Sequence, residues 1–477
     1  MLWTVVRMDA RNVRAEVSAW LALLLLATGV TYAAWSGAAA VHADRQAVAT
    51  ALTEQQTRMR DLQVRLHAVQ AGQKQATSTE DPSDPALVGS TLAAVWAVLP
   101  QLPLASVAVG QRDLAAARVR ITTQGPSGRS LQSDRPMTGP TRLLTGAFDL
   151  AFVLVALLPL VIIVLTYDLL AGERERGTLA LVLAHPVSLA TFVLGKALQR
   201  GLLLGSVTLG LALLAVAATV DGPWTSDDAV RMLLYLGTLM AYVGFWFAAA
   251  VAINVRGQTS AGNALALIGL WLALVVIVPG IVQVAVQATH PPPSRVELVN
   301  LTRAAASEIE AELSDLQGNH GADGKGTPAQ NAQAATERLV AVQVALEKRA
   351  APVLQAFGTQ LAAQQALVNA LRFLSPAIVL QEALGDVAGN GGHRLQQFHS
   401  QVDEFGQRWR NFFFSRVSAR QRLTVADYAA LPQFVFREES LPALGTRVGA
   451  GLMGLLLPTL LLIGWAGVGL RRGVRVM

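Results

Sequence analysis

Long apolar runs alternate with polar segments along the chain, and this alternation predicts the fold. A helix needs about 20 mostly apolar residues to cross the hydrocarbon core of a bilayer, and six runs reach that length. We therefore predict an all-α polytopic membrane protein with six transmembrane helices and two mainly helical extracytoplasmic domains, with a minor amount of β structure. The predicted spans are 17–36, 146–169, 196–220, 230–253, 262–286 and 445–470.

The first apolar run could also be a secretory signal peptide, because basic residues precede it. No small-residue cleavage site followed by a soluble chain is evident, and five more apolar runs follow. A retained membrane anchor is therefore the better interpretation of residues 17–36.

The short polar segments differ in charge, and this difference predicts their orientation. Lys and Arg gather near the N-terminus, after the second and fourth spans and in the tail, whereas the 221–229 link carries only acidic charges. Short basic loops face the cytoplasm, so both termini are predicted to be cytoplasmic, in the inner (cytoplasmic) membrane of a bacterium. The predicted cytoplasmic segments are 1–16 (amphipathic), 170–195, 254–261 and 471–477, and the predicted extracytoplasmic domains are 37–145 and 287–444.

The first of these large polar segments contains a heptad pattern. Apolar residues recur in alternating steps of four and three from Val48 to Val69, with Gln55 as the one polar member. The pattern predicts a helix that continues out of the first span and packs against another helix. A loop is predicted at 73–87, and the second half of 107–123 alternates as a strand does.

The second large segment opens with Pro291, Pro292 and Pro293, which predict a stiff exit from the fifth span. Helices are predicted at 295–317 and 331–374, the longer one with a kink at Pro352. Their apolar stripes are better explained by packing in a helical hairpin than by a cofactor pocket.

Composition agrees with a membrane protein, because 52% of residues are hydrophobic and only 15% are charged, against about 25% in soluble domains. The chain has no Cys, which excludes disulfides and thiolate metal sites. The net charge of +6 could suggest nucleic acid. The basic residues lie in the short segments beside the spans, however, and nucleic-acid binding is not predicted.

No catalytic residue, metal site or directly bound cofactor is predicted. The stretch GADGKGT (321–327) lacks the spacing of a phosphate loop, because Asn319 replaces the first glycine and Gly326 replaces the hydroxyl residue. His393 and His399 are six residues apart, and solvated side chains explain them better than metal ligands do.

Two acidic residues flank the second span. Asp149 and Asp168 can both reach an interface, and a boundary or capping role explains them better than a role in transport. Pro159 lies inside the span and predicts a kink there.

A dense charge cluster follows the second span in DLLAGERERGTLALVLAHP (168–186). Its flanking glycines, Gly172 and Gly177, permit sharp changes of backbone direction, and Glu173 and Arg176 are spaced to pair across a helical turn. The apolar stretch 179–184 is too short to span, so it must lie along the interface or against a partner. A helix is expected to stop before Pro186.

The run 148–198 resembles the signature region of ABC-2 type transporter permeases, the membrane subunits of ATP-driven exporters. The family pattern is an aspartate near the end of the second span, a GEREsGTL motif, a turn with proline and a Gly-Lys pair. Here these elements are Asp168, Gly172 to Leu179, Pro186 and Gly195-Lys196.

Three further stretches are similar to the subfamily with large extracytoplasmic insertions. They are RMDARNVRAEVSAWLALLLL at the N-terminus, LPLASVAVGQRDL (102–114) and DYAALPQFVFREESLPALGTRV (427–448). One departure is Ala115, where the subfamily commonly has proline, and it affects only the expected geometry of that loop.

The resemblance implies a non-catalytic permease that docks on a separate ATPase, which would bind ATP and Mg. Two ATPase copies and a second permease, identical or similar, would complete the dimer. The cytoplasmic segment after the second span would be the coupling helix, with its charges facing a groove on the ATPase. The implied coupling residues are Asp168, Gly172, Glu173, Arg174, Glu175, Arg176, Gly177, Thr178 and Pro186.

Three functions stay open at this point. The chain could be an exporter permease, a mechanotransmitting subunit that moves its periplasmic domains to act on a partner, or a receptor or scaffold that transports nothing. Membrane lipids and a periplasmic protein are further candidate partners, and the transported substrate is not identified by the sequence.

Overall fold

The computed structural model describes most of the 477-residue chain. The described residues are 2–73, 80–110, 118–124, 148–184, 188–219, 224–257, 259–291, 300, 303, 304, 307, 308, 311 and 328–473. The proline run after Pro291, the linker 321–327 and most of the predicted helix 295–317 lie outside them. The structure is 82% helical, with one two-stranded sheet in the described part, so the predicted fold class is confirmed.

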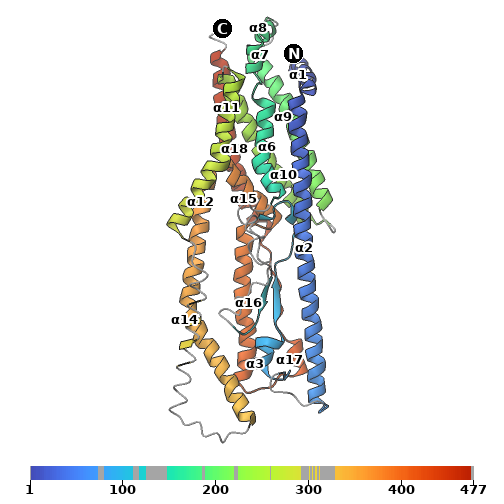
Figure 1. Ribbon diagram of the computed structural model, residues 1–477, viewed down its shortest axis with the longest axis vertical. Helices are drawn as coiled ribbons and strands as arrows, with labels where there is room; N and C mark the ends of the chain where they lie inside the picture. Colours follow the sequence, from blue (N-terminus) through green and yellow to red (C-terminus); the bar gives the residue numbers. More distant parts are fainter. Residues whose placement is uncertain are drawn as a thin grey trace.

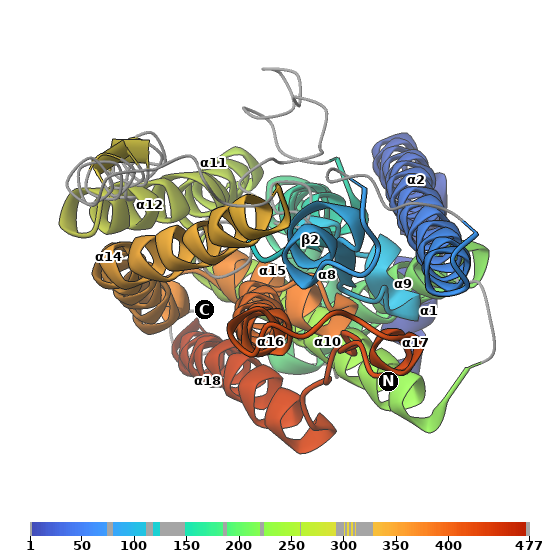
Figure 2. The ribbon, with the colours of Figure 1, turned by 90° about the horizontal axis from the view of Figure 1, so that it is seen from below.

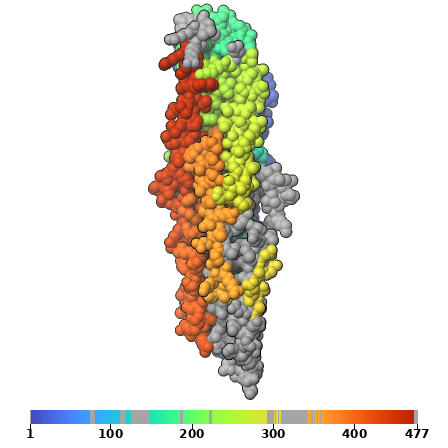
Figure 3. All heavy atoms as spheres, turned by 90° about the vertical axis from the view of Figure 1, so that its left-hand side faces the viewer, coloured from blue at the N-terminus to red at the C-terminus, as the bar shows by residue number. Residues whose placement is uncertain are grey.

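Six helical segments are long and apolar enough to cross a membrane. They lie together in one half of an elongated molecule, with both termini at the same end (Figure 1). Figure 3 shows the face where the yellow-green fifth segment lies beside the red sixth one. Four segments are single helices: α2 (Val17–Gln70), α9 (Leu189–Thr219), α10 (Ser226–Arg256) and α18 (Leu441–Gly473). The second segment, Leu150–Glu175, consists of α5 (Leu150–Phe152), a π turn (Val153–Leu157), α6 (Leu158–Thr166) and α7 (Ala171–Glu175). The fifth segment, Ser260–Thr289, consists of α11 (Ser260–Trp271), a π turn (Leu272–Ile277) and α12 (Val278–Thr289).

Helix α2 extends far beyond the membrane-spanning length. It has 54 residues, or about 80 Å at 1.5 Å per residue, which confirms that the helix continues out of the first span. Leu62 and Leu66 of the heptad pattern are buried. The carbonyl oxygen of the Gln55 side chain accepts a hydrogen bond of 2.7 Å from the backbone N–H of Trp96. The pattern therefore packs against a strand and the short helix α17 (Val425–Ala429), where a longer partner helix was expected.

That strand belongs to a small antiparallel sheet of β1 (Val95–Val98) and β2 (Arg118–Ile121), with Val95 opposite Ile121. The strand expected in the second half of 107–123 is thus present. Figure 2 shows β2 beside α16 (Gly392–Ser418) near the middle of the end-on view, with α2 at one edge.

The two large polar segments share one hydrophobic core at the end of the molecule far from the termini. We call this part the distal body, comprising the described residues of 48–124 and 392–440. Aromatic side chains of α16 pack there against α2, the sheet and the short helix α3 (Pro85–Leu87). The buried aromatic residues are Phe398, Phe405, Trp409, Phe413, Tyr428 and Phe436.

Two further helices connect the fifth span to the distal body. Helix α14 (Pro328–Leu371) continues through Pro352 and ends in a 3₁₀ turn (Arg372–Leu374), close to the predicted helix 331–374. Helix α15 (Pro376–Ala388) packs between α10 and α18, where the spans meet the distal body. It begins with Ser375, whose hydroxyl donates to the carbonyl of Leu274 in the second π turn.

The second span changes its helical geometry around Pro159. A π turn precedes α6, and Pro159 lies in the first turn of α6. Because proline has no N–H, the carbonyl four residues earlier loses its usual helical donor. That carbonyl, of Val155, accepts a hydrogen bond of 2.7 Å from the Tyr242 hydroxyl, and the next carbonyl, of Ala156, accepts one of 3.1 Å from Trp271 Nε1. Neighbouring spans thus satisfy the irregular backbone, as the interior of a membrane requires.

Replacing Tyr242 with Phe tests this role, because it removes the hydroxyl and keeps the buried ring. We expect the free energy of unfolding to fall by about 1–3 kcal/mol, since a buried carbonyl loses its donor. Denaturant titration in detergent micelles measures the change. Tyr32→Phe, at a ring position that is 56% exposed, is the control and should have no effect. Equal stability of the two variants would contradict the assignment.

Candidate functional site

The charge cluster after the second span folds as two short helices. Helix α7 contains the first charges, and α8 (Thr178–Leu183) follows it. Gly177 between them has φ +70°, a left-handed conformation that favours glycine. The turn expected at Gly177 is therefore present, whereas Gly172 lies inside α7. Pro186 and the residue before it lie outside the described residues.

Glu173 points into the protein. It is 7% exposed, and its Oε1 accepts a hydrogen bond of 2.8 Å from Lys196 Nζ on α9. The Thr178 hydroxyl donates to the other carboxylate oxygen. Arg176 Nη2 lies 3.7 Å from Oε1, which confirms the pair expected at this spacing. An outward orientation of Glu173, which the family resemblance implied, is not what the structure has.

The next two charges of the cluster contact the link between the fourth and fifth spans. Arg174 Nη1 donates a hydrogen bond of 2.8 Å to the carbonyl of Gly257. Glu175 accepts bonds of 2.7 and 2.8 Å from the backbone N–H and the hydroxyl of Ser260, at the start of α11. A carboxylate is favoured there by the partial positive charge of a helix N-terminus. These two charges therefore fix α7 to the link between α10 and α11.

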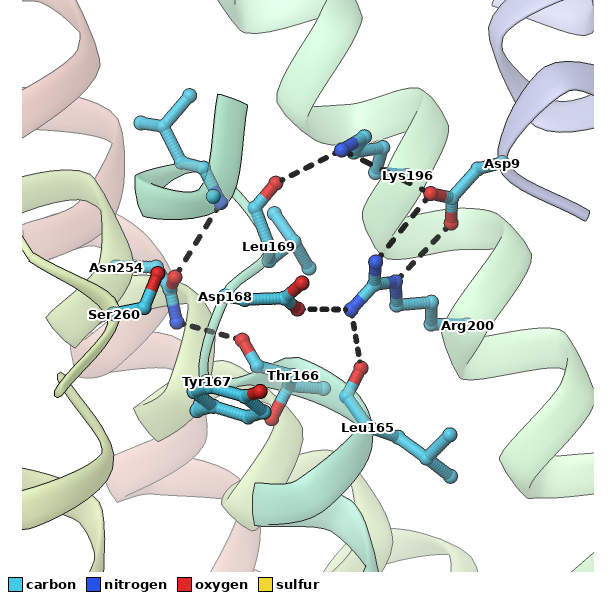
Figure 4. A network of polar contacts seen from close by, with 12 residues as sticks. Asp9, Leu165, Thr166, Tyr167, Asp168, Leu169, Lys196, Arg200, Asn254 and Ser260 are labelled. Carbon is cyan, nitrogen blue, oxygen red and sulfur yellow. Dashed lines mark hydrogen bonds and ion pairs between the residues drawn. The ribbon is translucent and has the colours of Figure 1, made fainter. Parts of the chain in front are cut away.

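A buried ion network lies directly beneath α7 (Figure 4). Arg200 of α9 is held between two carboxylates, with Nε 3.2 Å from Asp9 Oδ2 and Nη1 2.8 Å from Asp168 Oδ1. Lys196 Nζ lies 3.9 Å from Asp9 Oδ1 and donates to the carbonyl of Leu169 at 3.3 Å. Asp9, Lys196 and Arg200 are at most 4% exposed. The network joins the end of the second span, the third span and the N-terminal helix.

The N-terminal helix α1 (Leu2–Ala15) contributes Asp9 from an otherwise apolar face. Val5 and Val13 share this face, which packs on α9. A Cβ added to Gly195 would lie 2.7 Å from Val5 Cγ1, so the glycine before Lys196 lets α1 approach α9 closely. Any larger residue there would move Asp9 away from its partners.

Asparagine side chains hold the break between α6 and α7. Asn254 Nδ2 donates to the carbonyl of Thr166 at 2.8 Å, and its Oδ1 accepts from the backbone N–H of Leu170 at 3.4 Å. Asn263 Nδ2 donates to the carbonyl of Tyr167 at 3.2 Å and to Asn254 Oδ1 at 3.1 Å. The exit of the second span is thus positioned by side chains from the fourth and fifth spans.

The predicted site residues divide into an inner and an outer group. Asp168 and Glu173 belong to the buried network, and a Cβ on Gly172 would lie 3.3 Å from Asp168 Oδ2. Burial, followed by the negative charge of Asp168, raises the pKa of the nearby Glu16 carboxyl. Among the described residues of α7, α8 and their flanking turns, the exposed side chains are those of Glu175, Arg176, Ala180, Leu181 and Ala184.

Sequence reasoning did not name Asp9 as a site residue and counted Arg200 only among the basic residues that indicate orientation. It named Lys196 for orientation and in the Gly-Lys pair of the family pattern. A usable signal was present, because Asp9 interrupts the apolar positions of an amphipathic helix whose other charges are basic. An acid on such a face needs a buried cation. The sequence does not say which cation that is, since 191 positions separate Asp9 from Arg200.

Within the described residues, no group of three or more His, Asp or Glu side chains is arranged to hold a metal ion. His393 has Glu439 near its ring, with Nδ1 3.7 Å from Oε2. The chemistry of the site is therefore that of a charged, closely packed joint between helices.

Comparison with known proteins gives two results. A family model for ABC-2 family transporter proteins matches residues 3–424. The probable ABC transporter permease protein NosY of Pseudomonas aeruginosa is 33% identical over 131 residues, which cover 25% of this chain and 45% of that protein. The protein of the same name from Stutzerimonas stutzeri is 34% identical over 138 residues, 27% of this chain and 48% of that protein. The chain thus spans about half the length of the curated relatives it matches.

Replacing Arg200 with Gln tests the buried network. We expect the free energy of unfolding to fall by about 3–5 kcal/mol, because Asp9 and Asp168 are left buried without their cation. A further Asp9→Asn change should restore part of the loss. Arg7→Gln, on the exposed side of α1, is the control. Denaturant titration in detergent measures these changes. Equal stability of Arg200→Gln and Arg7→Gln would refute the assignment.

Proposed function

The chain belongs to the ABC-2 family of transporter proteins, and from this premise we propose that it is the membrane permease of an ATP-driven exporter. Under this proposal a separate ATPase binds ATP and Mg and hydrolyses the nucleotide, and the permease has no catalytic residues of its own. Two ATPase copies and a second permease, either a copy of this chain or a similar protein, complete the transporter. The observation that supports the proposal best is the joint formed by α7, α8 and the buried network.

That joint has the properties of a coupling element. Its outer surface offers Arg176 and Leu181 to a partner, and its inner surface holds Glu173 against Lys196. A push on α8 is therefore passed to α9 through an ion pair with little room to yield, since close-packed interiors transmit displacement. Glu175 passes the same movement to α11 through Ser260. We propose that the segment 170–195 is the coupling helix of the transporter.

The proposed orientation places this joint in the cytoplasm of a bacterium, at the inner membrane. Both termini lie at the same end of the molecule as α7 and α8 (Figure 1). Basic residues gather at that end, among them Arg7, Arg11 and Arg471, in accord with the rule that short cytoplasmic segments are basic. The distal body would then lie in the periplasm.

A mechanical function is the second candidate, and one observation favours it. Helix α2 is unbroken from the membrane to the distal body, where Leu62 and Leu66 enter the aromatic core. Such a helix can carry movement of the first span to a periplasmic protein without any solute crossing the membrane. In reconstituted vesicles, ATP-dependent uptake of a candidate solute would support transport. ATP-dependent change in the distal body with no uptake would support the mechanical function.

The coupling surface is tested by changing one of its exposed side chains, Leu181→Asp. We expect co-purification of a co-expressed ATPase, encoded beside this gene, to fall at least about tenfold, which corresponds to 1.4 kcal/mol of binding energy. The thermal unfolding temperature of the permease should not change, because Leu181 is 68% exposed.

The matched control carries Val435→Asp, a similar change on an exposed apolar residue of the distal body. It should retain the ATPase at the level of the parent chain. If the coupling variant also retained it, α7 and α8 would not be the docking surface.

A further inference from the structure

Arg231 is a buried cation with no carboxylate partner among the residues that the structure describes. It lies on α10 and is 5% exposed. Its Nη1 donates a long hydrogen bond of 3.3 Å to the carbonyl of Val387. Within the described residues no carboxylate oxygen lies within 4.0 Å of its guanidinium, whereas Lys196 and Arg200 each contact two carboxylates. An ionisable residue inside a membrane bundle is costly and commonly functional.

The acids nearest to Arg231 are committed to other groups. Asp228 forms the N-terminal cap of α10 with Thr225. Glu438 is paired with Arg394, and Glu439 is paired with Arg447. The positive charge of Arg231 is thus left to the Val387 carbonyl, near the C-terminus of α15, where carbonyls carry partial negative charge.

Tyr235 lies one helical turn from Arg231, on the same face of α10. Its side chain is 1% exposed, and its hydroxyl has no hydrogen-bond partner within the described residues. A buried hydroxyl without a partner costs about 1–3 kcal/mol, so two polar groups on one face of α10 are held at a cost in stability. Tyr235 belongs to a hydrophobic core that also contains Leu239 and Leu384.

We propose that Arg231 and Tyr235 bind the anionic group, phosphate or carboxylate, of an amphiphile that the transporter carries. A guanidinium binds such a group through two parallel hydrogen bonds, and the tyrosine hydroxyl donates a third. The Val387 carbonyl occupies the anion's position while α15 is packed on α10, and the site opens when α15 moves away. The apolar surroundings select a ligand with an apolar body. This inference rests on the proposed export function and names its substrate class.

The experiment measures lipid retained by the full-length chain after purification from nanodiscs of phosphatidylglycerol and phosphatidylcholine. We expect Arg231→Gln to retain about tenfold less phosphatidylglycerol than the parent, since the anionic group loses its charged hydrogen-bond donors. Arg231→Lys should lie between them, and Tyr235→Phe should lose a few-fold. Arg408→Gln, an exposed arginine of the distal body, is the control and should match the parent.

The unfolding temperature gives a second readout, and for this variant it is not expected to fall. Arg231→Gln should unfold at the same or a higher temperature than the parent, because no acid is left unpaired. A purely structural role for Arg231 predicts a lower unfolding temperature and unchanged lipid retention, and that result would overturn the proposal. A third result is also informative: the chain binds inorganic phosphate in a manner that needs Arg231 but retains no phosphatidylglycerol. That result would support an anion site for free phosphate and would overturn the proposal that the ligand is an amphiphile.

The same preparations are assayed for ATPase co-purification. Lost lipid retention in Arg231→Gln with normal ATPase binding supports the anion site. Equal retention in parent and variant, with normal ATPase binding, overturns the anion site and leaves the permease function intact. Failure of the parent chain to bind the ATPase counts against the permease function instead.

Discussion

The rest of the structure depends on how Arg200 is neutralised inside the bundle. Its guanidinium contacts Asp9 of α1 and Asp168 at the end of the second span. Both carboxylates are largely shielded from water, so each needs a cation as a partner. Taking these charges out of water costs several kcal/mol per ion, and only a complete set of partners offsets that cost. Helices α1, α6 and α9 must therefore keep one arrangement at this end, and α7 is held on top of it through Glu173 and Lys196.

The irregular backbone inside the bundle also depends on other segments, whose side chains donate hydrogen bonds to its carbonyl oxygens. The π turns of the second and fifth spans precede prolines, and Tyr242, Trp271 and Ser375 donate to carbonyls there. Asn254 does the same where α6 ends. Each of these donors lies outside the segment it serves, so the second and fifth spans depend on their neighbours for their shape, whereas α2 needs no such support.

The sequence predicts those features that are local along the chain. Six apolar runs, the glycine turn at Gly177 and the Glu173–Arg176 pair all follow from spacing. The inward position of Glu173 does not, because it is decided by Lys196, which is 23 positions away. Likewise a heptad pattern shows that a helix face is buried, but the partner that covers it, here β1 and the aromatic residues of α16, comes from far along the chain. The domain boundaries and the coupling residues stay predictions.

The two ends of α2 explain how movement could pass through the molecule. Near α1, the indole N–H of Trp20 donates to the carbonyl of Arg14 at 3.0 Å and joins the start of α2 to the helix that carries Asp9. At the other end, Gln55 holds β1. Between these points α2 contains neither a π turn nor a proline, unlike the second and fifth spans. Deformation is therefore less costly in the spans that contain π turns than in the continuous helix α2. A displacement of the ion network that keeps the contacts of Arg200 is carried through α1 to the start of α2.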